Sequence, residues 1–281
     1  MHGILSLVKN LLCACPGQIP RYSGLKYQSY YFALLKKLSN TCPAREGQYE
    51  LVGAKLELVI IIFILTLFPT GRCEAMAMDK SSVIIKLPAP YYDGNTSVET
   101  ALLKRRSIRS YSNEPLSLAG ISQLLWAAQG ITDSRGYRTA PSAGALYPLE
   151  IYIVAGKVRD IPAGIYKYRP HENELVKTVD GDKRAEVCRA SLNQSSISNA
   201  AAVIVFCAVY ERTTVKYGER GIRYVYIEVG HAVQNVYLQA VSLNLGTLVI
   251  GAFNDNELKN VMNFDLYEYP LCIMPVGRLA P

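Results

Sequence analysis

The chain lacks the residue spacings that metal centres and disulfide frameworks require. Its seven cysteines are an odd number, and no two of them form a C-x-x-C pair. Its three histidines show neither an H-x-x-x-H nor an H-E-x-x-H spacing. Zinc centres use such paired ligands, and disulfide-framed domains carry an even number of cysteines. We therefore expect no metal site and no disulfide framework.

A strong excess of one charge is also missing from most of the chain. The formal net charge is +7, but residues 1–78 hold 8 Lys/Arg against 4 Asp/Glu. Residues 79–281 hold 22 against 19 and are almost balanced. A nucleic-acid-binding surface needs many phosphate contacts. The charge distribution therefore predicts no nucleic-acid partner and favours a local anion site.

The apolar run 58–68 is too short to cross a bilayer comfortably. It holds 11 residues, whereas a spanning helix takes about 20. The run fits the apolar core of a secretory signal, because Lys55 precedes it and "AMA" at 75–77 is a plausible cleavage site. We interpret 51–78 as a signal peptide or membrane anchor, with 58–68 as the membrane contact. The alternative is a buried strand, a short helix or a loose hydrophobic extension.

Residues 1–50 are an extension of doubtful structure, because they lack sustained periodicity and are interrupted by proline and glycine. A translation start near Val52, on a non-standard codon, would place the signal-like segment at an N-terminus. The protein would then be exported or membrane-associated. If 51–78 is neither signal nor anchor, we expect a cytoplasmic protein.

From residue 79 onward, helical and strand patterns are mixed. The segment 149–156 alternates and ends on glycine, and 201–210 is a nearly continuous β-prone run typical of a central strand. Apolar residues recur at intervals of three and four over 222–243, which predicts a long helix ended by Gly246. Strict β-α-β repetition is missing. We expect one α+β domain over 79–281, with a mixed, largely antiparallel sheet wrapped by helices around a long central helix.

The segment "LKRRSIRSYS", residues 103–112, gathers four cations within six residues. The planar guanidinium of arginine donates two parallel hydrogen bonds to phosphate, and Ser107 adds a hydroxyl between the arginines. Where a helix passes into a turn, Arg105, Ser107 and Arg109 alternate and can converge on one phosphate monoester. A solvated basic face or a kinase site is the alternative interpretation.

Two further segments could surround a flat ligand. In "TAPSAGALYPLEIYIV", residues 139–154, small residues precede a strand and allow close approach to backbone N–H groups and the Ser142 hydroxyl. In "LNLGTLVIGAFND", residues 243–255, Gly251 opens a loop after β-prone residues. "PVGR" places Arg278 just after the expected last strand. Each of these segments alone is also compatible with ordinary tight turns.

Together these segments resemble the nitroreductase-like FMN-binding flavoproteins, and most closely their SagB-type (thiazole/oxazole dehydrogenase) branch. The resemblance covers roughly residues 98–279. It is carried by blocks in the same order: "RRSIRSY", "PSAGALYPLEIYIV", "GIYKY", "KYGERGIRYVYIEVGHAVQNVYLQAVSLNLGT" and "IGAF". Neither the extension nor the signal-like segment belongs to the pattern.

The resemblance implies three sets of contacts to FMN. Phosphate and ribityl contacts would come from Arg105, Arg106, Ser107 and Arg109, with Arg278 as a further phosphate partner. The flavin would be lined by Pro141, Ser142, Ala143 and Gly144. Backbone N–H groups of Ile250, Gly251 and Ala252 would face the pyrimidine end or N5, where they stabilise the charge that develops on reduction.

Lys216 and Tyr217 match the Lys-Tyr pair of azoline-oxidising members, where the pair removes a proton from the heterocycle. A lysine with a depressed pKa, or the adjacent tyrosine, could accept that proton. The alternative is a surface turn before the long helix. This chain has "RGIR" with Ile222 where "RGYR" is common in the branch, which weakens the transfer of substrate detail. His231 on the long helix fits a core or interface histidine better than a base.

The resemblance also implies a homodimer, because in this family both subunits contribute to each flavin pocket. We expect an FMN-dependent oxidoreductase that transfers two electrons through flavin N5. Either NAD(P)H reduces FMN for a nitroreductase reaction, or a small molecule or modified peptide such as an azoline reduces it. The sequence lacks a dinucleotide fingerprint, so NAD(P)H would dock only transiently. The alternative function is a non-catalytic flavin-binding accessory protein of a peptide-modifying complex.

Overall fold

The computed structural model describes residues 83–280, which contain seven strands, seven α-helices and a short 3-10 helix. The strands are β1 (Ile84–Lys86), β2 (Leu149–Ala155), β3 (Gly164–Arg169), β4 (Glu174–Asp180), β5 (Ala202–Ala208), β6 (Leu245–Thr247) and β7 (Tyr269–Arg278). The helices are α4 (Val98–Lys104), α5 (Leu118–Gln129), η1 (Ala143–Ala145), α6 (Arg184–Ala190), α7 (Ser195–Asn199), α8 (Glu211–Tyr217), α9 (Arg220–Ser242) and α10 (Asp255–Met262).

The strands form one sheet in the order β1-β4-β3-β2-β5-β7-β6, and all six pairings between them are antiparallel. The predicted α+β class with a largely antiparallel sheet is therefore confirmed. The run predicted as a central strand becomes β5, which lies between β2 and β7 and is buried along its whole length.

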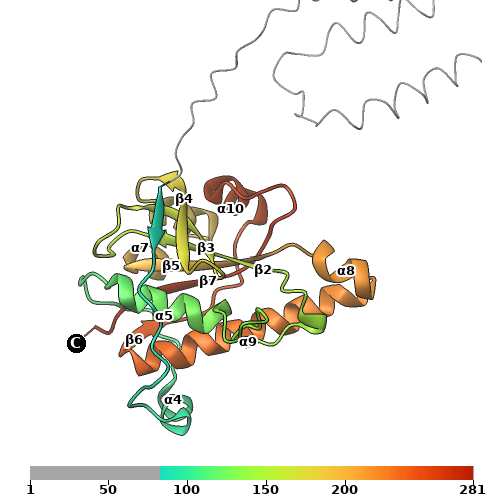
Figure 1. Ribbon diagram of the computed structural model, residues 1–281. Helices are drawn as coiled ribbons and strands as arrows, with labels where there is room; N and C mark the ends of the chain where they lie inside the picture. The colour runs from blue at the N-terminus through green and yellow to red at the C-terminus, as the bar shows by residue number, and fades with distance from the viewer. Residues whose placement is uncertain (1–82, 281) are drawn as a thin grey trace, which may run out of the picture. The chain divides into compact units, whose positions relative to one another are not determined.

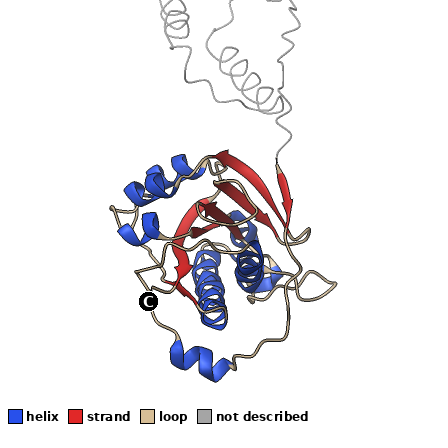
Figure 2. Cartoon of the chain, turned by 90° about the vertical axis from the view of Figure 1, so that its left-hand side faces the viewer, coloured by secondary structure: helices blue, strands red, loops and turns tan. Residues whose placement is uncertain are grey.

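Helices cover both faces of the sheet (Figure 1, Figure 2). Because successive strand residues point to opposite faces, Ile151 and Ile153 of β2 join the core beneath α5 and α9. Tyr152 and Val154 join the second core, which lies beneath α6, α7 and α10. The sheet thus separates two apolar layers.

Local sequence rules explain the ends of α5. The Ser117 hydroxyl accepts a hydrogen bond from the Gly120 N–H at the helix start, as an N-cap serine does. The helix stops at Gly130. A Cβ atom at Gly130 would lie 2.1 Å from the Trp126 ring, so a larger residue does not fit there.

The long helix α9 follows the predicted periodicity, but its predicted end at Gly246 is wrong. The helix ends at Ser242, and Gly246 lies inside β6, paired with Gly277 of β7. A Cβ atom at Gly246 would lie 2.7 Å from the Ile108 side chain. Gly246 therefore allows β6 to pack closely against the segment after α4.

Arg278 is the last residue of β7, whereas the sequence had placed it just after the strand.

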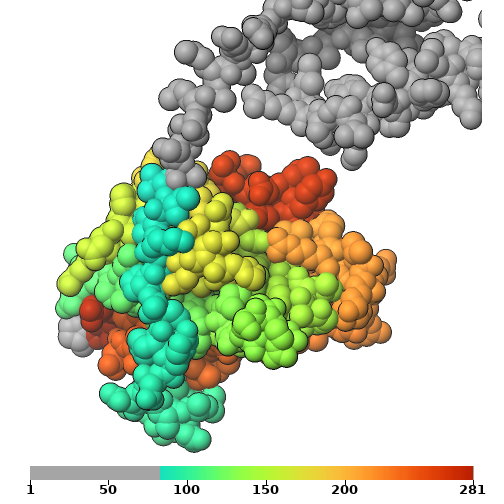
Figure 3. Space-filling view, in the orientation of Figure 1, coloured from blue at the N-terminus to red at the C-terminus, as the bar shows by residue number. Residues whose placement is uncertain are grey.

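The short helix α4 projects from the body of the domain (Figure 1, Figure 3). Ala101 is its buried contact, whereas Val98, Leu102 and Leu103 are exposed. The extension 1–50 and the signal-like segment 51–78 lie outside the described residues. Within residues 83–280, no helix combines the length and the apolar character needed to cross a membrane.

Candidate functional site

The residues predicted to bind phosphate lie where α4 ends. Arg105 is the C-cap residue of α4, and its guanidinium lies 5.2 Å from the centre of the Tyr237 ring. Ser107 follows in extended backbone and pairs with Thr247 at the edge of β6. Its hydroxyl lies 3.3 Å from the Tyr237 hydroxyl. Within residues 83–280, no carboxylate forms an ion pair with Arg105 or Arg109. Their positive charges are therefore available to an anion.

Arg106 and Arg278 are less free to reach the same anion. Arg106 donates to the carbonyls of Leu103 (3.1 Å) and Arg105 (2.7 Å), so its guanidinium caps the end of α4. Arg278 Nε lies 3.3 Å from Glu114 Oε2 on the segment that follows Arg109. Arg278 is thus near the cluster, but it already has a carboxylate partner.

The segment after β6 reaches the phosphate cluster through Tyr237. The Val249 N–H donates to the Tyr237 hydroxyl at 2.7 Å. The Ile250 N–H donates to the Ile273 carbonyl at 2.8 Å, so the expectation that Ile250 offers this group to a ligand is wrong. The N–H groups of Gly251 and Ala252 have no acceptor within residues 83–280, and the space beside Gly251 is open. These two positions fit the expected donors.

Gly144, in the expected flavin-lining loop Pro141–Gly144, lies against Lys216 and Tyr217 at the end of α8. A Cβ atom at Gly144 would lie 2.8 Å from the Tyr217 hydroxyl and 2.9 Å from Lys216 Nζ. Gly144 has a φ of 63°, a left-handed conformation that favours glycine. Lys216 and Tyr217 are the last two residues of a helix, not a turn. The structure therefore brings the expected flavin-lining loop and the candidate catalytic pair together.

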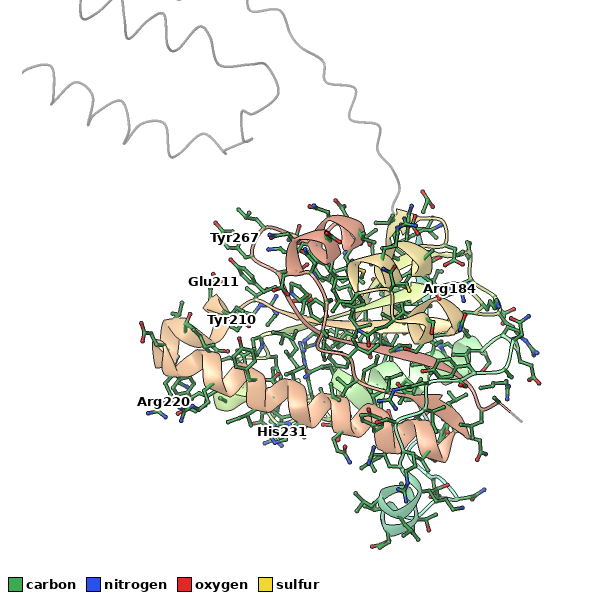
Figure 4. All side chains as sticks on the ribbon, turned by 180° about the vertical axis from the view of Figure 1, so that it is seen from behind. Arg184, Tyr210, Glu211, Arg220, His231 and Tyr267 are labelled. Atoms are coloured by element: carbon green, nitrogen blue, oxygen red, sulfur yellow. The ribbon has the colours of Figure 1, made fainter. Side chains whose placement is uncertain are left out.

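A buried acid beneath this loop was missed from the sequence. Glu228 on α9 is 2% exposed, and its carboxylate accepts a hydrogen bond from Gln129 Nε2 at 3.3 Å. The Ser142 hydroxyl lies close enough to this carboxylate to lower its pKa. Burial raises the pKa of Glu228 to about 7. The position of this acid among the apolar residues of the predicted helix is the sequence feature that could have indicated the site. His231, one turn further, lies on the exposed side of α9 (Figure 4).

The two groups of site residues lie towards opposite ends of α9 (Figure 1). Lys216 and Tyr217 precede the first residue of α9, whereas Tyr237 lies in its last turns. At 1.5 Å per residue, the 17 steps from Arg220 to Tyr237 correspond to about 26 Å along the helix axis. Within residues 83–280, no hydrogen bond or ring contact links the Ser107–Tyr237 group directly to Lys216 or Tyr217.

Comparison with known proteins identifies the family of this chain. The sequence model of the nitroreductase family matches residues 102–278. The chain belongs to the nitroreductase family. A Methanocaldococcus jannaschii protein named as a nitroreductase is 50% identical over 181 residues, which are 64% of this chain and 90% of that protein. The predicted family and fold are thereby confirmed. Membership of this family indicates oxidoreductase activity.

The chain is also similar to a peptide-processing protein and to a protein of known crystal structure. The microcin B17-processing protein McbC of Escherichia coli is 28% identical over 156 residues, 53% of this chain and 57% of McbC. This chain therefore spans little more than half of McbC. A crystal structure of a protein from Ralstonia eutropha JMP134, named as a nitroreductase, superposes with a TM-score of 0.64 at 29% identity. That match covers 72% of this chain and 92% of the other.

Proposed function

We propose that the protein is an FMN-dependent oxidoreductase whose phosphate site is formed by Arg105, Ser107 and Arg109. The observation that carries this proposal is the pair of arginines without carboxylate partners at the end of α4, next to the hydroxyls of Ser107 and Tyr237. A phosphate monoester carries nearly two negative charges and accepts hydrogen bonds from both kinds of group. Open space beside Gly251 fits the approach of a flat ring.

When bound, FMN would supply two-electron chemistry at its N5 atom. The chain would contribute the N–H groups of Gly251 and Ala252 as donors towards the ring, and a fixed N–H dipole favours the negative charge of a reduced flavin. Arg278 and Arg106 would serve as supporting charges, because each already has a partner within the domain. NAD(P)H remains the proposed donor for a reductase reaction.

We propose a homodimer that places the loop 141–144 of one subunit at the phosphate cluster of the other. This arrangement is supported by the positions of Tyr237, in the last turns of α9, and of Lys216 and Tyr217, before its first turn. Exposed apolar side chains on α9, including Tyr226 and Ile227, and on α4, including Leu103, offer surface for a second copy. Two equivalent sites per dimer would follow from the symmetry.

A second candidate reaction is the dehydrogenation of an azoline in a small molecule or modified peptide. It is favoured by the position of Lys216 and Tyr217 against Gly144. In this reaction two ring C–H bonds would break: one would release a hydride, for which bound FMN would be the acceptor, and the other would release a proton, which Lys216 or Tyr217 would accept. A reductase that takes electrons from NAD(P)H has no such need for a base.

The test is to purify the protein and identify any bound flavin by absorption and chromatography. The expected result is a yellow protein that releases FMN. Anaerobic mixing with NADH, NADPH and an azoline peptide then shows which donor bleaches the flavin band. A colourless protein that does not take up added FMN contradicts the cofactor. A yellow protein that no donor reduces supports the non-catalytic accessory function instead.

A further inference from the structure

The loop that contains Ser142 and Gly144 has an unusual backbone that other groups must hold in place. Ala145 and Tyr147 have φ values of 54° and 45°, and Gly144 has 63°. For residues with a Cβ atom, the left-handed region costs about 1–2 kcal/mol per residue. Such a conformation persists only where surrounding contacts fix it.

Hydrogen bonds below the loop supply those contacts. The Tyr147 N–H donates to Ser142 Oγ at 2.9 Å, and the Ser142 hydroxyl lies close enough to the Glu228 carboxylate to lower its pKa. Gln129 Nε2 donates to the same carboxylate, so Glu228 joins the loop to α5 as well as to α9. The carboxylate therefore holds one donor from each of two separate segments.

Arg138 completes this network from the other end of the loop. Its Nη1 donates to Gln129 Oε1 at 3.0 Å, and its guanidinium lies 4.5 Å from the centre of the Tyr147 ring. Its backbone N–H donates to the Tyr147 hydroxyl at 3.3 Å. The network thus runs from Glu228 through Gln129 and Arg138 to Tyr147, and returns through Ser142 to Glu228.

We propose that Glu228 is a positioning residue that sets the place of Gly144 relative to Lys216 and Tyr217, and so the geometry of the reaction. This inference rests on the proposed function, in which the loop lines the flavin. Glu228 does not itself touch Lys216 or Tyr217 in this proposal. It acts through Ser142, two residues before the glycine that the pair contacts.

The ionisation state of Glu228 should also affect the position of the loop. Arg138 is the charged group that faces it from the loop, and Glu150 and Arg212 act in turn on Arg138. An ionised Glu228 accepts both donors, whereas a protonated one presents a hydrogen to one of them. Because burial brings its pKa to about 7, the change falls within the neutral range. The loop geometry should then depend on pH.

The test compares Glu228→Ala with Glu228→Gln in the flavin-loaded protein. We expect Glu228→Ala to retain FMN and its KM but to lower kcat about 10- to 100-fold, as a displacement near 1 Å does. Glu228→Gln, which keeps a side chain of the same shape, should restore most of kcat and remove one transition near neutral pH from the profile. Unchanged kcat in Glu228→Ala, or an unchanged pH profile in Glu228→Gln, overturns the inference.

A second variant covers the case in which Glu228→Ala does not fold. Ser142→Ala removes the hydroxyl beside the Glu228 carboxylate, and we expect the same loss of kcat. If the wild-type protein itself binds no flavin, the proposed function fails, but the positioning role is still measurable. Hydrogen exchange at residues 142–147 should then be faster in Glu228→Gln than in wild type only above the pH at which Glu228 ionises. Equal exchange at every pH contradicts the role of Glu228.

Discussion

The hydroxyl groups of Ser107 and Tyr237 lie 3.3 Å apart, although 130 residues separate them in the chain. The same tyrosine receives the Val249 N–H and lies beneath the Arg105 guanidinium. Tyr237 therefore joins the end of α4, the end of α9 and the segment after β6. These are the three parts of the chain that the proposed phosphate and flavin contacts require.

Removing the two unpaired arginines should release the cofactor. Charge-assisted hydrogen bonds contribute about 1.5–3 kcal/mol each, so the double variant Arg105→Ala/Arg109→Ala should weaken FMN binding by about 3–6 kcal/mol. Fluorescence titration of the apoprotein with FMN measures the loss. Arg159→Ala/Arg189→Ala, which removes two exposed arginines outside the site, is the matched control. If the arginine-deficient variant stays yellow, the phosphate binds elsewhere.

Loss of the Tyr237 hydroxyl should lower stability modestly. Tyr237→Phe leaves the Val249 N–H without its acceptor and costs about 1 kcal/mol. For a domain of this size, that corresponds to a fall in Tm of roughly 2–4 °C. Thermal unfolding of the apoprotein provides the measurement, and Tyr92→Phe, at an exposed tyrosine, is the control. An unchanged Tm means that water replaces the hydroxyl without loss.

Gly144→Ala should damage catalysis more than it damages the fold. The added methyl group would lie within 3 Å of Lys216 Nζ and the Tyr217 hydroxyl, and the residue has a positive φ. Gly181→Ala is a matched control, since Gly181 has a φ of 82° but no atom within 4 Å of a new Cβ. Both variants should lose about 1–2 kcal/mol of stability from the backbone. Only Gly144→Ala should reduce kcat; equal kinetics in the two variants argue against a role for the pair.

A charge on the exposed side of α9 should separate the subunits. Ile227→Glu places a carboxylate on the proposed dimer surface. Burying this carboxylate without a charged partner is unfavourable. Light scattering after gel filtration should give a monomer that retains little FMN. Leu266→Glu, also at an exposed apolar residue, controls for the added charge. A wild-type protein that is already monomeric and yellow rejects the shared site.

The stability difference between Glu228→Gln and wild type should depend on pH. Burial raises the pKa of Glu228 from 4.5 to about 7, so the fold favours the neutral acid. The stabilisation from that preference is complete below pH 4.5 and is lost as the pH rises to about 7. Glu228→Gln should therefore gain up to about 3 kcal/mol over wild type across this window and then remain constant. Urea unfolding at pH 4.5, 6 and 8 measures the gain.

The exposed Glu172 provides the control for that series. Glu172→Gln removes one carboxylate from a turn between β3 and β4, and its difference from wild type should vary less with pH. A Glu228→Gln difference that does not change between pH 4.5 and pH 8 contradicts the effect of burial on Glu228.

Periodicity and β-propensity were enough to predict β2, β5 and the long helix α9. The Ser117 cap and the Gly130 end of α5 are local features, because each depends on residues within one turn of the helix. The buried β5 follows from its nearly continuous run of β-prone residues. Gly246 shows the limit. A glycine is needed at this position because the Ile108 side chain, which is distant in the chain, leaves no room for a Cβ atom. The rule that glycine often ends a helix uses neighbouring residues alone, and it therefore assigned Gly246 wrongly to a helix end.

The order of residue types along the chain is enough to establish the family, the α+β class and the motif that carries Arg105, Ser107 and Arg109. Which motifs meet depends on the folded structure. It united Ser107 with Tyr237, and Gly144 with Lys216 and Tyr217, and it separated these two groups along α9. It also buried Glu228 beneath Ser142. Such contacts depend on how α9 packs against the sheet and loops, and residue spacing does not encode that packing.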